Sequence, residues 1–214
     1  FNDGLGDGAA NVYVAMAGTF LTAYYTDTVG IAAAAVGTMM LLTRILDGIT
    51  DLIMGAIVDK TKSKYGKARP WVLWTAPLMA IGLILLFINP VAFSAGGKLA
   101  YIYITYIFTN CLVYTANNLP YNALLSRMTL NVQDRATTAS MRFIMTSITS
   151  LIINAVTMPL VGAIGWTATA CIFAAAELVM LLMCFFGCKE HIGEDAAGGS
   201  VKVENVPLKD ALPY

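Results

Sequence analysis

Six long apolar stretches with short connections constrain the fold of this 214-residue chain more than any other feature. A helix needs about 20 predominantly apolar residues to cross the hydrocarbon core of a bilayer. Hydrophobic residues make up 58% of the chain and charged residues only 12%, against about 25% charged in an ordinary soluble domain. The sequence therefore predicts an all-α membrane protein with six transmembrane helices. They are expected at about 5–26, 32–58, 71–90, 99–124, 138–163 and 166–188.

The charges of the connections predict the orientation of the six spans. Basic residues gather in the connections 59–70 and 127–136, whereas 27–31 and 164–165 contain none. By the positive-inside rule, the two basic connections are cytoplasmic. We therefore expect a multi-pass protein of the cytoplasmic (inner) membrane with both ends of this chain in the cytoplasm. The basic residues concerned are Lys60, Lys62, Lys64, Lys67, Arg69, Arg127 and Arg135.

The composition changes after the sixth span, and this change predicts the domain organisation. Residues 1–188 form the expected six-span N-terminal transmembrane bundle, and residues 189–214 are polar and contain several glycines. Such a segment is typical of a flexible linker, expected here to be cytoplasmic and to lead toward a missing C-terminal half. Six spans with short loops are typical of one half of a twelve-span transporter, often built from two three-helix inverted repeats. The expected partners are then membrane lipid and a C-terminal six-helix half.

Three charges lie on one face of the second span. Arg44 and Asp47 are separated by three residues and Asp47 and Asp51 by four, so a helix stacks them on one side. Charges inside a membrane normally face a bundle interior or a wet cavity. Two carboxylates next to the hydroxyl of Thr50 predict a site for a proton or for a hard cation such as Na⁺. The alternative is a structural Arg44–Asp47 ion pair.

The fourth span carries a polar stripe that predicts a solute-binding wall. Asn110, Tyr114, Asn118 and Asn122 follow one another at intervals of four, and Pro120 is expected to bend the helix. Asparagine donates and accepts hydrogen bonds at once, which suits vicinal hydroxyls, and tyrosine offers a ring to the apolar face of a sugar. The alternative is hydrogen bonding between helices, a common role of asparagine in membranes.

Four further polar residues lie in or near the other spans. Asn11 lies inside the first span, whereas Asp7 near its end could simply be solvated or cap a helix. Arg142 could extend to the cytoplasmic interface or reach the cavity and meet substrate oxygens. Glu177 stands alone in the sixth span, where a structural role is favoured.

The loop DKTKSKYGKARP predicts either orientation by positive charge alone or a gate latch. In the latch hypothesis, Asp59 at the end of the second span pairs with a basic group, and the residues concerned are Asp59, Lys60, Gly66 and Arg69.

No GxxxxGK[ST] loop supports ATP-driven transport. The net charge of zero leaves no basic surplus for nucleic acid, and the four cysteines are expected to be packing thiols. We expect no catalytic residues, no cofactor and no metal site beyond a possible Na⁺ at Asp47 and Asp51.

These segments resemble the glycoside–pentoside–hexuronide cation symporters of the major facilitator superfamily, which include the melibiose permease. The resemblance rests on YYTDTVGI at 24–31, RILDGITDLIMG at 44–55, the basic loop with Trp71, and NNLPYNAL at 117–124. It implies a symporter that moves a sugar or glycoside together with Na⁺ or H⁺. The cation residues it implies are Asp47, Asp51 and Thr115, with Thr50 beside them, and the sugar residues are Asn11, Arg44, Tyr114, Asn118, Asn122 and Arg142.

The chain departs from the melibiose-type branch at several of these positions. That branch has acidic residues where Asn11 and Asn118 stand, so a melibiose-like substrate is in doubt. It has an asparagine where Thr50 stands, which leaves the choice between Na⁺ and H⁺ open. A transporter-like protein that binds or senses a solute without coupled transport is the alternative function. A membrane enzyme is disfavoured because no nucleophile set or metal cluster is visible.

Overall fold

The structure is a computed structural model that describes residues 2–61, 69–91, 93–128 and 132–187. Within those ranges, the side chains of 2–5, 59, 69, 123–128, 132–136 and 138 lie outside the description. The expected linker at 189–214 also lies outside it.

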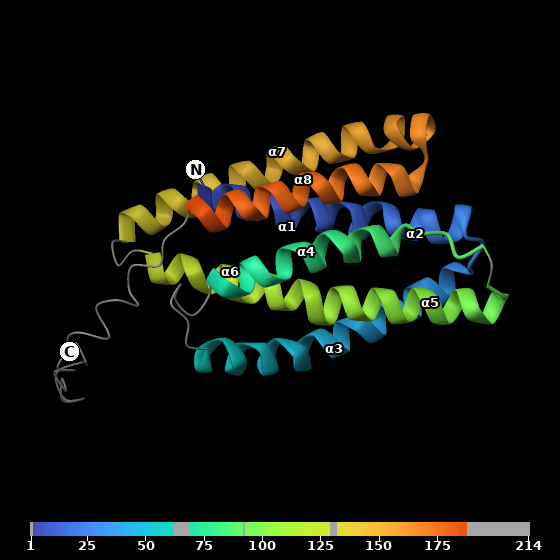
Figure 1. Cartoon of the computed structure of the whole chain (residues 1–214), viewed down its shortest axis with the longest axis horizontal. Helices are drawn as coiled ribbons and strands as arrows, with labels where there is room; N and C mark the ends of the chain where they lie inside the picture. Colours follow the sequence, from blue (N-terminus) through green and yellow to red (C-terminus); the bar gives the residue numbers. More distant parts are fainter. Residues whose placement is uncertain (1, 62–68, 92, 129–131, 188–214) are drawn as a thin grey trace, which may run out of the picture.

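Six helical rods run roughly alongside one another and make up the described fold (Figure 1). The first rod is continuous from residue 2 to residue 28, and the fourth from residue 95 to residue 128. The predicted all-α architecture of six helices is therefore confirmed. The elements are α1 (Asn2–Ala15), η1 (Met16–Phe20), α2 (Leu21–Ala23), η2 (Tyr24–Thr28), α3 (Ala33–Lys60), α4 (Arg69–Leu86), α5 (Ala95–Ile107), η3 (Phe108–Tyr114), α6 (Thr115–Met128), α7 (Val132–Ile164) and α8 (Trp166–Gly187).

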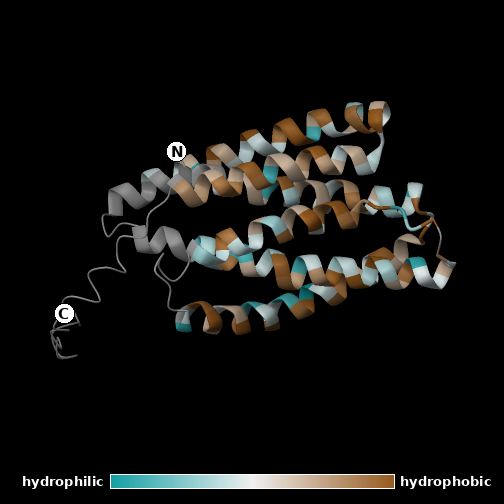
Figure 2. Ribbon diagram, in the orientation of Figure 1, coloured by the Kyte–Doolittle hydropathy of each residue, from teal (hydrophilic) through white to brown (hydrophobic). Residues whose placement is uncertain are grey.

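The apolar character of the rods is that of a multi-pass membrane protein. Among the described residues, three helices, Ala95–Asn122, Ala139–Ile164 and Trp166–Phe186, are long and apolar enough to cross a bilayer, and Pro70–Leu86 is a shorter apolar helix. α3 has 28 residues but contains the charges at 44, 47 and 51. Large hydrophobic side chains stay exposed on the outside of α3 and α7, and hydrophobic residues run along every rod (Figure 2). Such an outer surface suits lipid or another helical bundle rather than water.

The packing of the rods has the symmetry of two three-helix repeats. α1 packs against α7 and α8, while α6 packs against α3 and α4. α1 belongs to the first rod and α6 to the fourth, while α3, α4, α7 and α8 are the second, third, fifth and sixth rods. If the first three rods are exchanged in order with the last three, the contacts of α1 with α7 and α8 become those of α6 with α3 and α4. The contact between α4 and α8 becomes itself under the same exchange. The contacts therefore follow the predicted inverted-repeat arrangement.

π-helical turns interrupt the first rod of each repeat near its middle. η1 lies within the first rod and η3 within the fourth, and η2 ends the first rod. A π-helix forms hydrogen bonds from i to i+5 and occurs mostly as short insertions, often at functional sites. Each insertion changes which residues share a face, so side chains before and after η3 point in different directions.

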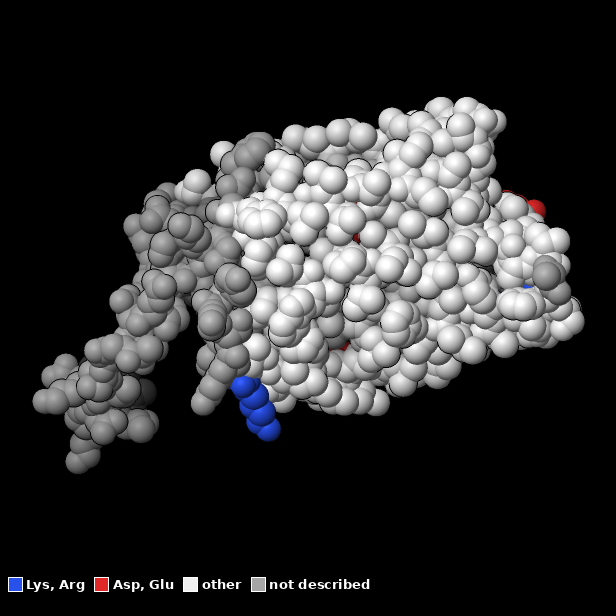
Figure 3. Space-filling view, in the orientation of Figure 1, with Lys and Arg blue, Asp and Glu red and all other residues white. Residues whose placement is uncertain are grey.

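The helices on either side of the two basic connections meet one end of the bundle. α3 ends and α4 begins there, as α6 ends and α7 begins, and both ends of the described chain lie there too (Figure 1). At the opposite end, Gly30 with φ +79° and Gly165 with φ +84° make the tight turns before α3 and before α8. In the view of Figure 3, the long side of the bundle shows almost no charged atoms between its two ends.

An aromatic cluster closes the end of the bundle that lies opposite the basic connections. The rings of Phe87 and Trp166 stack at 5.8 Å, and Tyr24 contacts both at 5.2 and 5.4 Å. The carbonyl of Phe87 accepts hydrogen bonds from the hydroxyls of Tyr24 (3.1 Å) and Thr167 (2.8 Å). These contacts join the first, third and sixth rods. Elsewhere, Cys111 and Cys184 are buried free thiols, as expected of packing thiols, whereas the free thiol of Cys171 is exposed and Cys188 lies outside the described residues.

Candidate functional site

An ion pair between Asp7 and Arg142 joins the first and fifth rods. The Arg142 Nη2 donates to Asp7 Oδ1 at 2.8 Å, and Arg142 Nε also contacts the carboxylate. The side chain of Arg142 is 12% exposed and that of Asp7 is 19% exposed. The guanidinium of Arg142 lies 4.8 Å from the centre of the Tyr121 ring. Of the two alternatives for Arg142, the structure therefore has the inward one. Asp7, whose role the sequence left open, is the carboxylate that holds it.

A chain of amide hydrogen bonds extends this ion pair along α6. The Arg142 Nη2 also donates to Asn122 Oδ1 at 2.8 Å, and Asn122 donates to Asn118 at 2.5 Å. Asn118 in turn donates to the hydroxyl of Tyr114 at 2.9 Å. The spacing of four residues in α6 stacks these side chains one above another, as the sequence predicted. Four of the predicted sugar residues thus form one connected network with Asp7.

The remaining member of the predicted stripe, Asn110, binds other partners than the network does. It lies in η3, where the π-helical turn changes its direction relative to Tyr114. Its amide nitrogen lies 3.2 and 3.4 Å from the two carboxylate oxygens of Asp47, and its oxygen accepts from the Tyr13 hydroxyl at 3.3 Å. Asn110 therefore connects the carboxylate face of α3 to the first rod, and Tyr13 stacks on Tyr114 at 5.1 Å.

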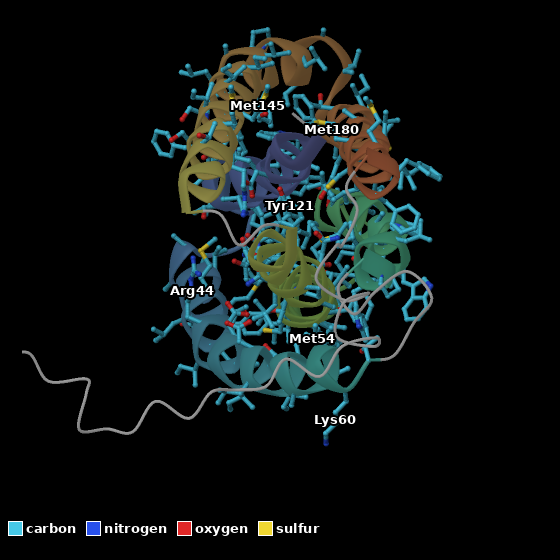
Figure 4. All side chains as sticks on the ribbon, turned by 90° about the vertical axis from the view of Figure 1, so that its left-hand side faces the viewer. Arg44, Met54, Lys60, Tyr121, Met145 and Met180 are labelled. Atoms are coloured by element: carbon cyan, nitrogen blue, oxygen red, sulfur yellow. The ribbon has the colours of Figure 1, made fainter. Side chains whose placement is uncertain are left out.

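The charged face of α3 is not held by an internal ion pair. Arg44 and Asp51 are exposed, Asp47 is half-buried, and neither Arg44 nor Asp51 makes a hydrogen bond or ion pair with a described residue. Figure 4 places Arg44 at the rim of the bundle and Tyr121 near its centre. The alternative of a structural Arg44–Asp47 pair is therefore wrong for the described conformation.

The two predicted hydroxyl ligands differ in their surroundings. The Thr50 hydroxyl donates to the backbone carbonyls of Leu46 (3.2 Å) and Asp47 (3.1 Å), so its lone pairs remain available. Thr115 is 6% exposed, directly follows η3, and its hydroxyl has no hydrogen bond to a described residue. Oxygen atoms with unused lone pairs are the ligands that hard cations require.

Two asparagines connect helices rather than line the stripe. Asn11 donates to the backbone carbonyl of Thr146 in α7 at 2.8 Å, so its amide ties the first rod to the fifth. Asn117 is 2% exposed and donates to Thr75 of α4 at 2.7 Å. One residue along α6 turns a side chain by about 100°, so Asn117 lies in the interface with α4 although its neighbour Asn118 belongs to the stripe.

The predicted gate lies mostly outside the described residues. Gly66 is among the undescribed residues, as are the side chains of Asp59 and Arg69. Lys60 ends α3, is exposed, and points away from the bundle (Figure 4). The latch hypothesis therefore stays a prediction.

Sequence reasoning missed the role of Tyr13. Its ring is 1% exposed and its hydroxyl links Asn110 to the first rod. Tyr13 lies between apolar residues and has no periodic polar partner in its own span, so the sequence carried no signal for it. Asn110, by contrast, belongs to the stripe of span four, so the sequence did mark it as a polar residue that could bind Asp47 of span two.

Fold and site together define a class of protein. Inverted three-helix repeats, an apolar outside and a polar network inside are typical of one half of a secondary transporter. The chain belongs to the family described as MFS/sugar transport protein, whose profile matches residues 3–207. The resemblance identified from the sequence motifs is thereby confirmed.

Several curated relatives carry transporter names. The putative glycoside/cation symporter YagG of Escherichia coli (strain K12) is 38% identical over 96% of this chain and 46% of its own length. The isoprimeverose transporter of Lactiplantibacillus pentosus is 35% identical over 99% of this chain and 45% of its own length. The glucuronide carrier protein homolog of Escherichia coli (strain K12) is 34% identical over 98% of this chain and 47% of its own length. The chain thus spans about half the length of these relatives.

Proposed function

We propose that this chain forms the N-terminal half of a symporter that moves a sugar or glycoside across the cytoplasmic membrane together with Na⁺ or H⁺. The observation that carries the proposal is the connected network of Asp7, Arg142, Asn122, Asn118 and Tyr114 beside the Asp47–Asn110 contact. Family membership and the names of the relatives support the same function.

The network offers the chemistry that a sugar requires. Arg142 supplies a fork of donors, the amides of Asn118 and Asn122 donate and accept, and Tyr114 presents a ring and a hydroxyl. In the described conformation these groups satisfy one another, so a solute would replace hydrogen bonds between side chains without leaving buried groups unpaired. Asn122 is exposed, which gives a solute access to the network. Arg44, on the rim, and Asn11, beside the network, complete the proposed sugar-binding set.

The carboxylate face of α3 is the proposed cation site. Asp47 and Asp51 supply the charge, and Thr50 and Thr115 supply hydroxyl oxygens. Two carboxylates four residues apart repel one another, and a bound Na⁺ or H⁺ removes that repulsion. Tyr114, at the end of the sugar network, lies within electrostatic range of Arg44, Asp7 and Asp47. This proximity supports coupling between the two proposed sites.

The proposed orientation puts the basic connections and both ends of this chain in the cytoplasm. It rests on the Lys and Arg residues of 59–70 and 127–136, because the helices that these two segments connect end or begin at the same end of the bundle. We further propose that Asp59, Lys60, Gly66 and Arg69 form a gate latch there. A cysteine placed at Ser63 should react with an impermeant thiol reagent only from the cytoplasmic side, and one at Gly96 only from outside. Reversed labelling would overturn the orientation.

Uptake of radiolabelled sugars by vesicles that contain the full-length protein tests the function. We expect concentrative uptake of at least one glycoside, pentoside or hexuronide when a Na⁺ or pH gradient is applied, and equilibration only without a gradient. Solute binding without uptake under any gradient would replace the proposal by the sensing alternative. Absence of both binding and uptake across the panel would contradict the sugar site itself.

A further inference from the structure

Glu177 is a buried carboxylate that neither proposed site uses. It lies in the middle of α8, is 0% exposed, and neither carboxylate oxygen has a hydrogen-bond partner in the structure. The described residues thus contain a side chain with two strong acceptors and nothing to donate to them. Buried polar groups are hydrogen-bonded in the great majority of structures, so this exception needs an explanation.

The position of Glu177 is fixed by close packing on both sides. It shares the inward stripe of α8 with Ala174, Leu181 and Cys184, each 1% exposed. This stripe faces α1 and α4, the two helices on which α8 mainly packs. At Gly8 of α1, an added Cβ would lie 2.5 Å from Met180 of α8, so the two helices approach closely there.

Few titratable or charged groups face Glu177 from the helices around it. On α1, the Tyr13 hydroxyl interacts electrostatically with the carboxylate. The described side chains of α4, at 70–86, include no charged residue. The charged residue among the described side chains of α7 is Arg142, which binds Asp7 and Asn122. On α8 itself, Cys171 is exposed and Cys184 is buried on the same stripe.

These surroundings decide which ligand Glu177 can hold. An ionised carboxylate without a partner in an apolar interior is far more costly than the neutral acid. A metal cation would need several oxygen ligands, and no group of three His, Cys, Asp or Glu side chains clusters among the described residues. A proton needs only the carboxylate oxygen itself and removes the buried charge, so it is the ligand that these surroundings favour.

We propose that Glu177 is a proton-binding site that keeps its proton while α8 is packed against α1 and α4. Release breaks the O–H bond and passes the proton to water, which requires these helices to separate far enough for water to enter. The Tyr13 hydroxyl interacts electrostatically with Glu177 and donates to Asn110, which donates to Asp47. Proton release would therefore change the electrostatic potential at one end of this hydrogen-bonded chain. The proposal does not depend on which solute or cation the other sites bind.

Infrared spectroscopy of the full-length protein in lipid tests the protonation state directly. We expect a C=O stretching band of a protonated carboxylic acid at neutral pH, lost in Glu177→Gln. Asp27→Asn is the matched control, because Asp27 is an exposed carboxylate at the end of the bundle, and this variant should keep the band. If Glu177→Gln retains the whole band, or wild type has none, the proposal is wrong.

The pH dependence of stability gives a second readout that packing alone would not change. The unfolded chain loses the Glu177 proton in the ordinary carboxyl range, whereas the folded chain keeps it, so unfolding releases a proton. The unfolding equilibrium constant should therefore rise with pH by up to about tenfold per unit. Glu177→Gln stays neutral and should remove this contribution to the pH dependence. If the glutamine variant does not fold, Glu177→Leu is measured in its place. Equal pH dependence in wild type and in the folded variant would overturn the proposal.

Discussion

The two ends of the bundle are held by different chemistry. At the end opposite the basic connections, Tyr24, Phe87 and Trp166 pack ring against ring, and their hydrogen bonds go to a backbone carbonyl. Toward the other end, Asp7, Arg142 and Asn122 bind one another through side chains, and Asn122 is exposed. The hydroxyls of the first region both donate to one backbone carbonyl, whereas the side-chain hydrogen bonds of the second region could be exchanged for bonds to a solute.

This difference suggests that the aromatic end mainly stabilises the fold and that the side-chain network mainly binds the solute. Aromatic rings in a close-packed cluster contribute through buried contact, which any cavity weakens. Side-chain hydrogen bonds add little net stability, but they place donors and acceptors at defined positions. Substitutions in the aromatic cluster should therefore change unfolding, and substitutions in the network should change solute binding. The following variants of the full-length protein test this division.

The largest effect is expected from Phe87→Ala. Phe87 is 0% exposed, stacks on Trp166 and contacts Tyr24, so its removal leaves a cavity between the first, third and sixth rods. We expect a loss of about 3–5 kcal/mol in stability, measured by thermal unfolding in detergent. Solute affinity of the folded fraction should change less than about twofold. A large loss of affinity without loss of stability would contradict the division between the two ends.

Arg142→Ala should have the next largest effect, and it should act on binding. The variant removes the donors to Asp7 and Asn122 together. Loss of hydrogen bonds of this kind costs about 1–3 kcal/mol, so we expect solute affinity to fall about tenfold or more. Equilibrium binding of a labelled glycoside measures it. Arg142→Lys keeps the charge but not the fork of donors and should recover only part of the affinity. Unchanged binding in both would favour the alternative of interhelical hydrogen bonding.

Neighbouring asparagines give a matched comparison on one helix. Asn118 belongs to the network, whereas Asn117 donates to Thr75 in the interface with α4. We expect Asn118→Ala to weaken solute binding by about 1–2 kcal/mol and Asn117→Ala to lower stability by a similar amount. Binding isotherms and unfolding curves on both variants separate the two effects. If both variants changed solute binding and stability equally, the face of α6 on which an asparagine lies would not decide whether it serves binding or stability.

Much of the fold could be predicted because it depends on local, repeated signals. The length of each apolar stretch and the Lys and Arg residues between them predicted six helices with boundaries mostly within a few residues. The end of the third helix was placed too late, since α4 stops at Leu86. The start of the fifth was also placed too late, because α7 begins at Val132 in a polar segment that hydropathy excludes.

The site was predicted where contacts lie along one helix and missed where they cross between helices. The spacing of Tyr114, Asn118 and Asn122 is visible in the sequence, and these side chains do bond to one another. The pairing of Asp7 with Arg142 spans 135 residues and depends on how the repeats pack. The turn of Asn110 toward Asp47 depends on a π-helical segment, for which periodicity gives no signal.

Asp51→Asn is expected to have the smallest direct effect on solute affinity. Asp51 lies one turn from Asp47, is exposed, and makes no hydrogen bond or ion pair with a described residue. Asp47 differs, because Asn110 donates to its carboxylate and connects it to the first rod. The proposed sugar network lies mainly on α1, α6 and α7, so the variant should change solute affinity without added cation by less than about 1 kcal/mol.

The same variant should nevertheless remove the coupling between cation and solute. Binding of Na⁺ or H⁺ relieves the repulsion between Asp47 and Asp51, and whatever conformation this favours must also alter solute affinity if the two sites are linked. Linkage is reciprocal, so a variant that no longer responds to the cation should also lose solute-dependent cation binding. Solute affinity at several Na⁺ concentrations and pH values, for wild type and Asp51→Asn, measures this directly. Gradient-driven accumulation should be lost while exchange without a gradient survives. If the variant keeps full stimulation by the cation, Asp51 is not the coupling residue, and Asp47 with Asn110 becomes the place where the two sites communicate.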